Sequence, residues 1–180
     1  CFFLPAVVLT AVYAYFRMAP FGDRSILIMD LSEQYVDFFA GLKDIWNGNS
    51  SLQFSWFKAF GQNYIGVIAY HLSSPLSLLT LLVPNEYLPA GLLILNVVKI
   101  GLAGLTFGIF LKGFFRRCDL SAVLFSLTYG LASYSIVYSM NLMWLDGVIW
   151  LPIVLLGVEK LVQTGRMRLF LISLAVVFVS

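Results

Sequence analysis

The acidic side chains of this protein gather in one polar stretch, residues 20–63. Five of them lie there: Asp23, Asp30, Glu33, Asp37 and Asp44. A carboxylate that is held in place can accept a proton from a reacting group, which is the chemistry of a general base. Asp30 is the candidate for such a role because it stands directly before an amphipathic segment that would hold it still.

Asp30 also has a purely structural interpretation. The pattern Asp30-x-x-Glu33 before an apolar run of helical period is a capping box, in which the first carboxylate accepts free backbone N–H groups. Such a cap contributes about 1 kcal/mol. Both interpretations stay open, because a carboxylate has two oxygen atoms.

Lys99 lies near the centre of a long apolar segment, residues 89–111. A charge at that depth costs about 2.5–3.5 kcal/mol on insertion scales, so Lys99 is expected to face the interior of a helix bundle, with Asn96 one turn away. It would bind a phosphate or carboxylate group of a ligand, or form a buried pair with an acid beyond these 180 residues.

Three further residues bring polar groups to the apolar segments. His71 is the only histidine and has no zinc-binding spacing. It would relay a proton or be a hydrogen-bonded residue in a broken helix. Asn141 and Asp146 lie at the end of a hairpin, where they would line a site. Asp146 could instead cap the segment that begins at 147.

The composition indicates an all-α, polytopic membrane protein. Hydrophobic residues make up 61% of the chain and charged residues 11%, against about 25% charged residues in soluble domains. The formal charge of +2 is too small to suggest a nucleic-acid partner. Because the chain begins and ends inside apolar runs, we expect it to be the N-terminal part of a larger transmembrane domain.

Five apolar segments are expected to cross the membrane, and a sixth is ambiguous. The five are residues 1–18, 89–111, 120–138, 147–163 and 168–180, the last of them incomplete. Segment 64–83 is long enough to span. However, Ser73, Ser74 and Pro75 at its middle favour a broken, re-entrant or interfacial element.

Lysine and arginine residues predict the orientation of these spans. Basic clusters follow span 89–111 and precede span 168–180: Lys112, Arg116 and Arg117, and Lys160, Arg166 and Arg168. Both clusters are expected in the cytoplasm. The turn 139–146 has no basic residue and is expected outside. Loop 20–88 lies outside if segment 64–83 does not span, and we favour that placement.

The loop is predicted to contain an amphipathic helix at 31–46. Its apolar face has helical spacing and comprises Leu31, Tyr35, Phe38, Phe39, Leu42, Ile45 and Trp46. Asn47-Gly48 then ends the helix. Its polar face is acidic, so attraction to anionic lipid is not expected. The helix is instead expected to pack on the protein and to roof a site.

Four stretches of the sequence resemble the YfhO family of bacterial membrane proteins. They are APFGDRSILIMDLSEQYVDFF, FSWFKAFGQNYIGVIAYHLSSPLSLL, LNVVKIGLAGLTFGIFL and MNLMWLDGVIWLPIVLLGVEKL, in this order along nearly the whole chain. This family is similar in plan to the GT-C glycosyltransferases, which transfer a sugar from a polyprenyl-phosphate carrier. The resemblance implies a multi-pass protein of the bacterial cell membrane, an extracytoplasmic loop 20–88, and an envelope glycopolymer such as teichoic acid as acceptor.

The resemblance also implies roles for individual residues. In the GT-C plan the first external loop carries juxtamembrane helices and an acidic catalytic residue, and Asp30 matches that place. The carrier phosphate would be held by positive or hydrogen-bonding groups, for which the candidates are Arg24, Lys58, His71 and Lys99. The candidates for lining the pocket are Gln34, Tyr35, Asn141 and Asp146.

No cofactor is expected. Some GT-C enzymes hold a divalent metal with paired acids, but Asp23 and Asp30 are too far apart in sequence to make a compact ligand pair. A metal is therefore possible but not favoured.

Two other functions stay open. A transporter or flippase would also contain broken helices and a buried lysine. A non-catalytic envelope-assembly protein would use the loop as a docking face. The aromatic stretch 54–60 does not distinguish them, because it suits either a sugar ring or an aromatic belt at the membrane surface.

Overall fold

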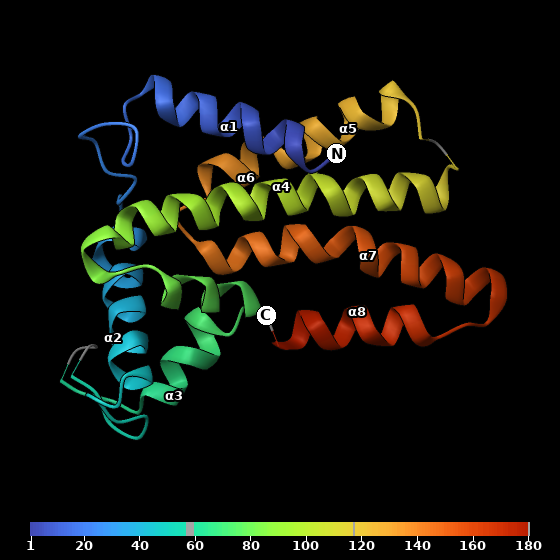
Figure 1. Ribbon diagram of the computed structural model, residues 1–180. Helices are drawn as coiled ribbons and strands as arrows, with labels where there is room; N and C mark the ends of the chain where they lie inside the picture. Colours follow the sequence, from blue (N-terminus) through green and yellow to red (C-terminus); the bar gives the residue numbers. More distant parts are fainter. Residues whose placement is uncertain (57–59, 117, 180) are drawn as a thin grey trace.

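The computed structural model describes residues 1–56, 60–116 and 118–179, and every regular element in these ranges is a helix (Figure 1). The α-helices are α1 Phe3–Tyr15, α2 Val36–Trp46, α3 Tyr64–Val67, α4 Leu88–Phe114, α5 Leu120–Gly130, α6 Ser133–Val137, α7 Leu142–Thr164 and α8 Arg168–Val179. The π-helices are η1 Leu31–Tyr35 and η2 Ile68–Leu72, and the 3₁₀ helices are η3 Pro75–Leu82 and η4 Asn85–Tyr87. The predicted all-α class is confirmed.

Three helical stretches of the described chain are long and apolar enough to cross a membrane: Asn85–Phe114, Leu120–Val137 and Leu142–Thr164. A bent pair of helices, Tyr64–Leu72 and Pro75–Leu82, would make a fourth if both halves form one span. Helices α1 and α8 are apolar but shorter. These lengths fit an integral membrane protein.

Helix α4 is the central element of the bundle. It packs against α1, α5 and α7, and α7 packs in turn against α8. Figure 1 shows α2 lying across the end of the bundle at which α4 begins, while the turn between α7 and α8 lies at the opposite end. The polar loop between α1 and α4 therefore gathers at one end only.

The amphipathic helix expected at 31–46 consists of η1 followed by α2. Leu31, Tyr35 and Phe39 on its apolar face are each 1% exposed. Trp46 is an exception, because it closes the helix and is 72% exposed. The helix ends at Trp46 with Asn47 as its C-cap, and Gly48 follows in the left-handed conformation with φ +77°, as the Asn-Gly pair predicts.

Segment 64–83 is bent sharply at its centre. Its two halves, Tyr64–Leu72 and Pro75–Leu82, meet at 107°. Ser74 is extended, with ψ 128°, and Pro75 begins the second half as its first helical residue. The bend arises because proline has no N–H group to continue the preceding helix and disfavours helical geometry in the residue before it.

Two element boundaries differ from the sequence-based prediction. Helix α7 begins at Leu142, directly after Asn141, rather than at 147. Asp146 therefore lies inside this helix, and the prediction that it caps the helix is wrong. The segment expected at 120–138 is divided into α5 and α6 between Gly130 and Ser133.

Helices α7 and α8 approach closely at a glycine. A Cβ atom on Gly157 would lie 2.7 Å from the Cα atom of Phe170, which is backbone and cannot easily move aside. Gly147 lies in the same helix, but a Cβ atom there would meet nothing within 4 Å. The two glycines of α7 therefore differ in what they contribute to packing.

We predict that Gly157→Ala lowers the free energy of unfolding by about 1–3 kcal/mol, the usual range for overpacking. Gly147→Ala is the matched control. It should be neutral or stabilising by up to about 1 kcal/mol, because alanine favours the helix. Thermal unfolding of the full-length protein in detergent measures both. Equal melting temperatures for the two variants would contradict the close approach of α7 and α8.

A candidate catalytic carboxylate beside a buried ion pair

A buried ion pair joins α4 to α7. The side chains of Lys99 and Asp146 are 1% and 3% exposed, and the Lys99 Nζ atom donates to the Asp146 Oδ2 atom. The same Nζ atom lies 2.9 Å from the backbone oxygen of Leu142, at the start of α7. The acid that pairs with Lys99 therefore lies within this chain, and the expectation of a partner beyond it is wrong.

Ser74 connects the bent segment to this ion pair. Its Oγ atom donates to the Asp146 Oδ1 atom at 2.9 Å and lies 3.4 Å from the Lys99 Nζ atom. Ser74 sits between η2 and η3, so the bend itself carries the contact. Three elements that are far apart in sequence thus meet at one buried polar cluster, formed by Ser74, Lys99 and Asp146.

The hydrogen-bonding capacity of Lys99 is used up inside the protein. An ammonium group has three N–H donors, and three acceptors surround this one: a hydroxyl, a backbone carbonyl and a carboxylate. Binding a ligand phosphate would require Lys99 to give up at least one of these partners. Lys99 and Asp146 are therefore suited to hold helices in position.

Asn96, one turn before Lys99, is 1% exposed. Its side-chain oxygen and nitrogen have no hydrogen-bond partner among the residues that the structure describes. Asn141, which precedes α7, is 8% exposed, and its side chain makes no capping hydrogen bond. Buried amides are usually satisfied, so Asn96 stands apart from the closed cluster beside it.

Asp30 does not cap the helix that follows it, so the capping-box prediction is wrong. The N–H groups of Ser32 and Glu33 donate to the backbone oxygen of Met29, at 3.0 and 2.9 Å. Leu31 donates in the same way to Ile28. Met29 has a φ of +46°. This turn brings backbone carbonyls to the first N–H groups of the helix, and no side-chain acceptor is needed.

The Asp30 carboxylate is consequently left for other contacts. It is half-buried, and the described residues give its side chain one hydrogen bond, from the Gln34 Nε2 atom to its Oδ1 atom at 3.4 Å. Gln34 follows one helical turn later, so the pair is local. A carboxylate at the edge of the protein with one long hydrogen bond is well placed to accept a proton from a ligand.

Tyr35 is close enough to both Asp30 and Asp146 for the two carboxylate charges to affect its hydroxyl group. Its side chain is 1% exposed, and burial raises the pKa of Tyr35 to about 12. The Met143 backbone opposes this rise of the pKa, and the charges of Asp30 and Asp146 and the phenol of Tyr70 add to it in smaller measure. Both carboxylates therefore act on the same phenol. At neutral pH Tyr35 is protonated and has a hydroxyl to donate.

His71 belongs to the same packed group. Its ring lies 5.5 Å from that of Tyr35, 4.8 Å from that of Phe38 and 4.6 Å from that of Tyr70, measured between centroids. The first two neighbours come from η1 and α2, whereas His71 lies in η2. The bent segment and the amphipathic helix are thereby packed together around an imidazole that is 8% exposed.

The predicted site residues fall into two neighbouring groups and two outliers. Asp30, Gln34, Tyr35 and His71 form one group, and Asn141, Lys99 and Asp146 lie in the other. Arg24 is exposed in the loop, and Lys58 lies outside the described residues. The described residues hold no cluster of three or more histidine, cysteine or acidic side chains that could bind a metal ion.

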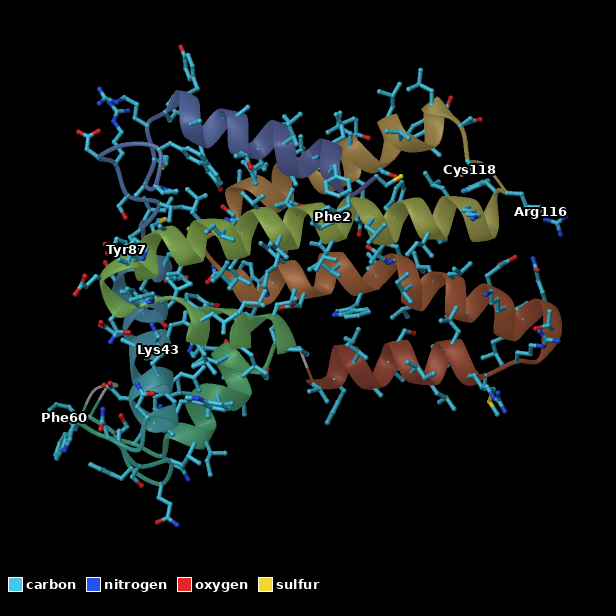
Figure 2. The ribbon with its side chains drawn as sticks, in the orientation of Figure 1. Phe2, Lys43, Phe60, Tyr87, Arg116 and Cys118 are labelled. Carbon is cyan, nitrogen blue, oxygen red and sulfur yellow. The ribbon has the colours of Figure 1, made fainter. Side chains whose placement is uncertain are left out.

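Two contacts were not predicted as parts of the site. The sequence predicts Ser74 only as part of a helix break. The one signal for its contact with Asp146 is a serine next to a proline in the middle of an apolar segment. Lys43, labelled in Figure 2 on α2, is 7% exposed and donates to the backbone oxygen of Val83. A lysine on the helix does not indicate this contact, since its partner is a backbone atom 40 residues away.

Comparison with known proteins gives a family match along the whole chain. Residues 1–180 match the family described as bacterial membrane protein YfhO, which confirms the resemblance found in the sequence. No curated protein matches the chain. No solved structure matches it either.

We predict that Lys99→Met lowers the free energy of unfolding by about 3–5 kcal/mol, because it leaves Asp146 charged and buried without its partner. The double variant Lys99→Met/Asp146→Leu should recover most of this loss, since it removes both charges. Thermal unfolding in detergent gives the comparison. If the double variant is no more stable than the single one, Lys99 and Asp146 do not stabilise the fold through their mutual contact.

Proposed function

We propose that this chain, which belongs to the YfhO family of bacterial membrane proteins, is part of a membrane glycosyltransferase. The proposed donor is a sugar linked to a polyprenyl phosphate, and the proposed acceptor is an envelope glycopolymer such as teichoic acid. The proposed reaction takes place on the outer side of the cell membrane, where loop 20–88 would lie. Family membership is compatible with this chemistry.

The observation that carries the proposal is the uncommitted carboxylate of Asp30. The backbone turn at Met29 supplies the acceptors for the first N–H groups of the helix, so the most common structural use of an acid at this position does not apply. The remaining hydrogen bond of the carboxylate, with Gln34, is 3.4 Å long. Asp30 is thus positioned by the fold and available to a ligand.

Asp30 would act as the general base. The acceptor hydroxyl attacks the anomeric carbon and passes its proton to the carboxylate, while the bond from that carbon to the carrier phosphate breaks and the phosphate leaves with the electron pair. General base catalysis of this kind contributes roughly 10²–10⁴ in rate. The Tyr35 hydroxyl, kept protonated by its raised pKa, lies buried in the same helix that begins after Asp30 and can support the site from below.

The leaving phosphate needs a positive or hydrogen-bonding partner. Lys99 is poorly suited, because its three donors already have acceptors in the buried cluster. Arg24 in the exposed loop is free of any ion pair in the described chain. We therefore assign the phosphate to the loop, with Arg24 as the described candidate and Lys58 as a further one. His71, Gln34 and Asn141 remain candidates for the surroundings of the site, whereas both Asp146 oxygens are engaged in the buried cluster.

The sharp bend at Ser74 favours one alternative, a transporter or flippase. Broken helices near a buried charge are the usual sites of substrate binding in such proteins, and the halves of segment 64–83 meet at 107° beside Lys99. A flippase would move the lipid-linked sugar without transferring it. Measuring both movement and transfer of the same donor separates the two functions.

We predict that Asp30→Asn lowers sugar transfer by a factor of about 10²–10⁴. The full-length protein in membranes would be supplied with a panel of radiolabelled polyprenyl-phosphate monosaccharides and envelope acceptor. Since Asp30 caps no helix, the substitution should leave the melting temperature unchanged. Asp37→Asn, at an exposed position of α2, is the matched control and should retain transfer. Transfer by Asp30→Asn within threefold of the wild type would overturn the assignment of the base.

The proposed side of the membrane is tested by labelling. Asn49 is exposed in the loop after α2. A cysteine placed there, in a background in which the exposed Cys1 and Cys118 are replaced by serine, should react with a membrane-impermeant maleimide added to intact cells. A cysteine placed at Thr164, which is exposed at the opposite end of the bundle, should react only after lysis. The reverse pattern would place the loop in the cytoplasm.

A further inference from the structure

A second group of polar side chains lies at the end of the bundle opposite α2, where α7 turns into α8 (Figure 1). A cavity of about 670 Å³ opens there, within the size range of small-molecule sites. Three of its lining residues are cationic: Lys160, Arg166 and Arg168. It has no connection with the chemistry assigned to the loop.

The cations are brought together by a tight turn. Helix α7 ends at Thr164, and Gly165 follows with φ +68°, a conformation that favours glycine. The Gly165 N–H group donates to the Leu161 oxygen at 2.9 Å. Helix α8 then begins at Arg168, so Arg166 and Arg168 lie at the same cavity as Lys160 at the end of α7.

The charges of these three residues are not neutralised within the described chain. No salt bridge there involves Lys160, Arg166 or Arg168. One acid, Glu159, also lines the cavity and accepts a hydrogen bond from the Gln163 Nε2 atom, so the cations outnumber the acids there by three to one. The lining therefore carries an excess of positive charge, and an anion bound among the three cations would be favoured.

The cavity also has an apolar part, next to the polar side chains of Gln163 and Thr164. Leu156, Met167 and Leu169 contribute to its lining. Beyond the turn, α8 exposes further large apolar side chains, including Leu171, Ile172 and Leu174. A ligand that fits both surfaces carries a phosphate group at one end and a hydrocarbon chain at the other.

We propose that this cavity, lined by Lys160, Arg166 and Arg168, binds the phosphate headgroup of an anionic membrane phospholipid. Basic pockets between membrane helices are suited to such headgroups. The guanidinium groups of Arg166 and Arg168 can each form paired hydrogen bonds with phosphate oxygens, and the apolar wall receives the beginning of an acyl chain. The lipid would bind at the α7–α8 turn and hold the two helices together.

The test uses the full-length protein, stripped of lipid in detergent and titrated with phosphatidylglycerol or phosphatidylcholine, with native mass spectrometry as the readout. Each basic group near an anionic lipid contributes about fivefold in affinity. The wild type should therefore bind phosphatidylglycerol at least tenfold more tightly than phosphatidylcholine. Arg166→Gln/Arg168→Gln should weaken phosphatidylglycerol binding by about 25-fold.

The control variant is Lys112→Gln/Arg116→Gln, which removes the same charge from two exposed cations near the end of α4 that do not line this cavity. It should change the affinity by less than threefold. If both variants lose the same affinity for phosphatidylglycerol, the lipid responds to the overall surface charge and not to this cavity, and the proposal is overturned. Equal binding of the two lipids by the wild type would overturn it without any variant. Saturation of the cavity by inorganic phosphate alone, at the same concentration as the lipid, would assign it to a soluble anion instead.

Discussion

The buried contact among Lys99, Asp146 and Ser74 is the constraint on which the arrangement of this protein depends. A lysine in the middle of an apolar helix is tolerated only if its charge is paired away from lipid. Here the pairing draws in α7 through Asp146 and the bent segment through Ser74. One electrostatic requirement thus fixes the relative positions of three elements that lie far apart in the sequence.

This constraint reaches the candidate catalytic residue through packing. The bend at Ser74 carries η2 and His71 against Tyr35 and Phe38, which belong to the amphipathic helix. That helix is also tied by Lys43 to the backbone after η3. Asp30 stands at its start, and its position is therefore supported from the core while its carboxylate remains available. A general base needs this combination of fixed position and free oxygens.

The two ends of the bundle carry opposite kinds of polar chemistry. The end at which α4 begins has the acidic loop and the proposed sugar-transfer site. The other end has the basic turn between α7 and α8 and the proposed lipid site. The helices between the two ends are apolar, and three of the described helical stretches are long enough to cross a membrane. The proposed orientation and the proposed lipid contact both rest on this distribution of charge.

The sequence by itself determined the helical class, the family and the amphipathic helix, since these follow from local composition, spacing and motif order. It also located the break at Ser74 and Pro75, because proline acts locally. It did not determine what Asp30 and Asp146 do. Whether an acid caps a helix depends on which acceptors lie next to the first N–H groups. Here the backbone oxygen of Met29 accepts from the N–H groups of Ser32 and Glu33, so the Asp30 carboxylate does not. The partner of Lys99 was likewise decided only by tertiary structure, because an acid 47 residues away becomes a neighbour only when α4 and α7 pack together.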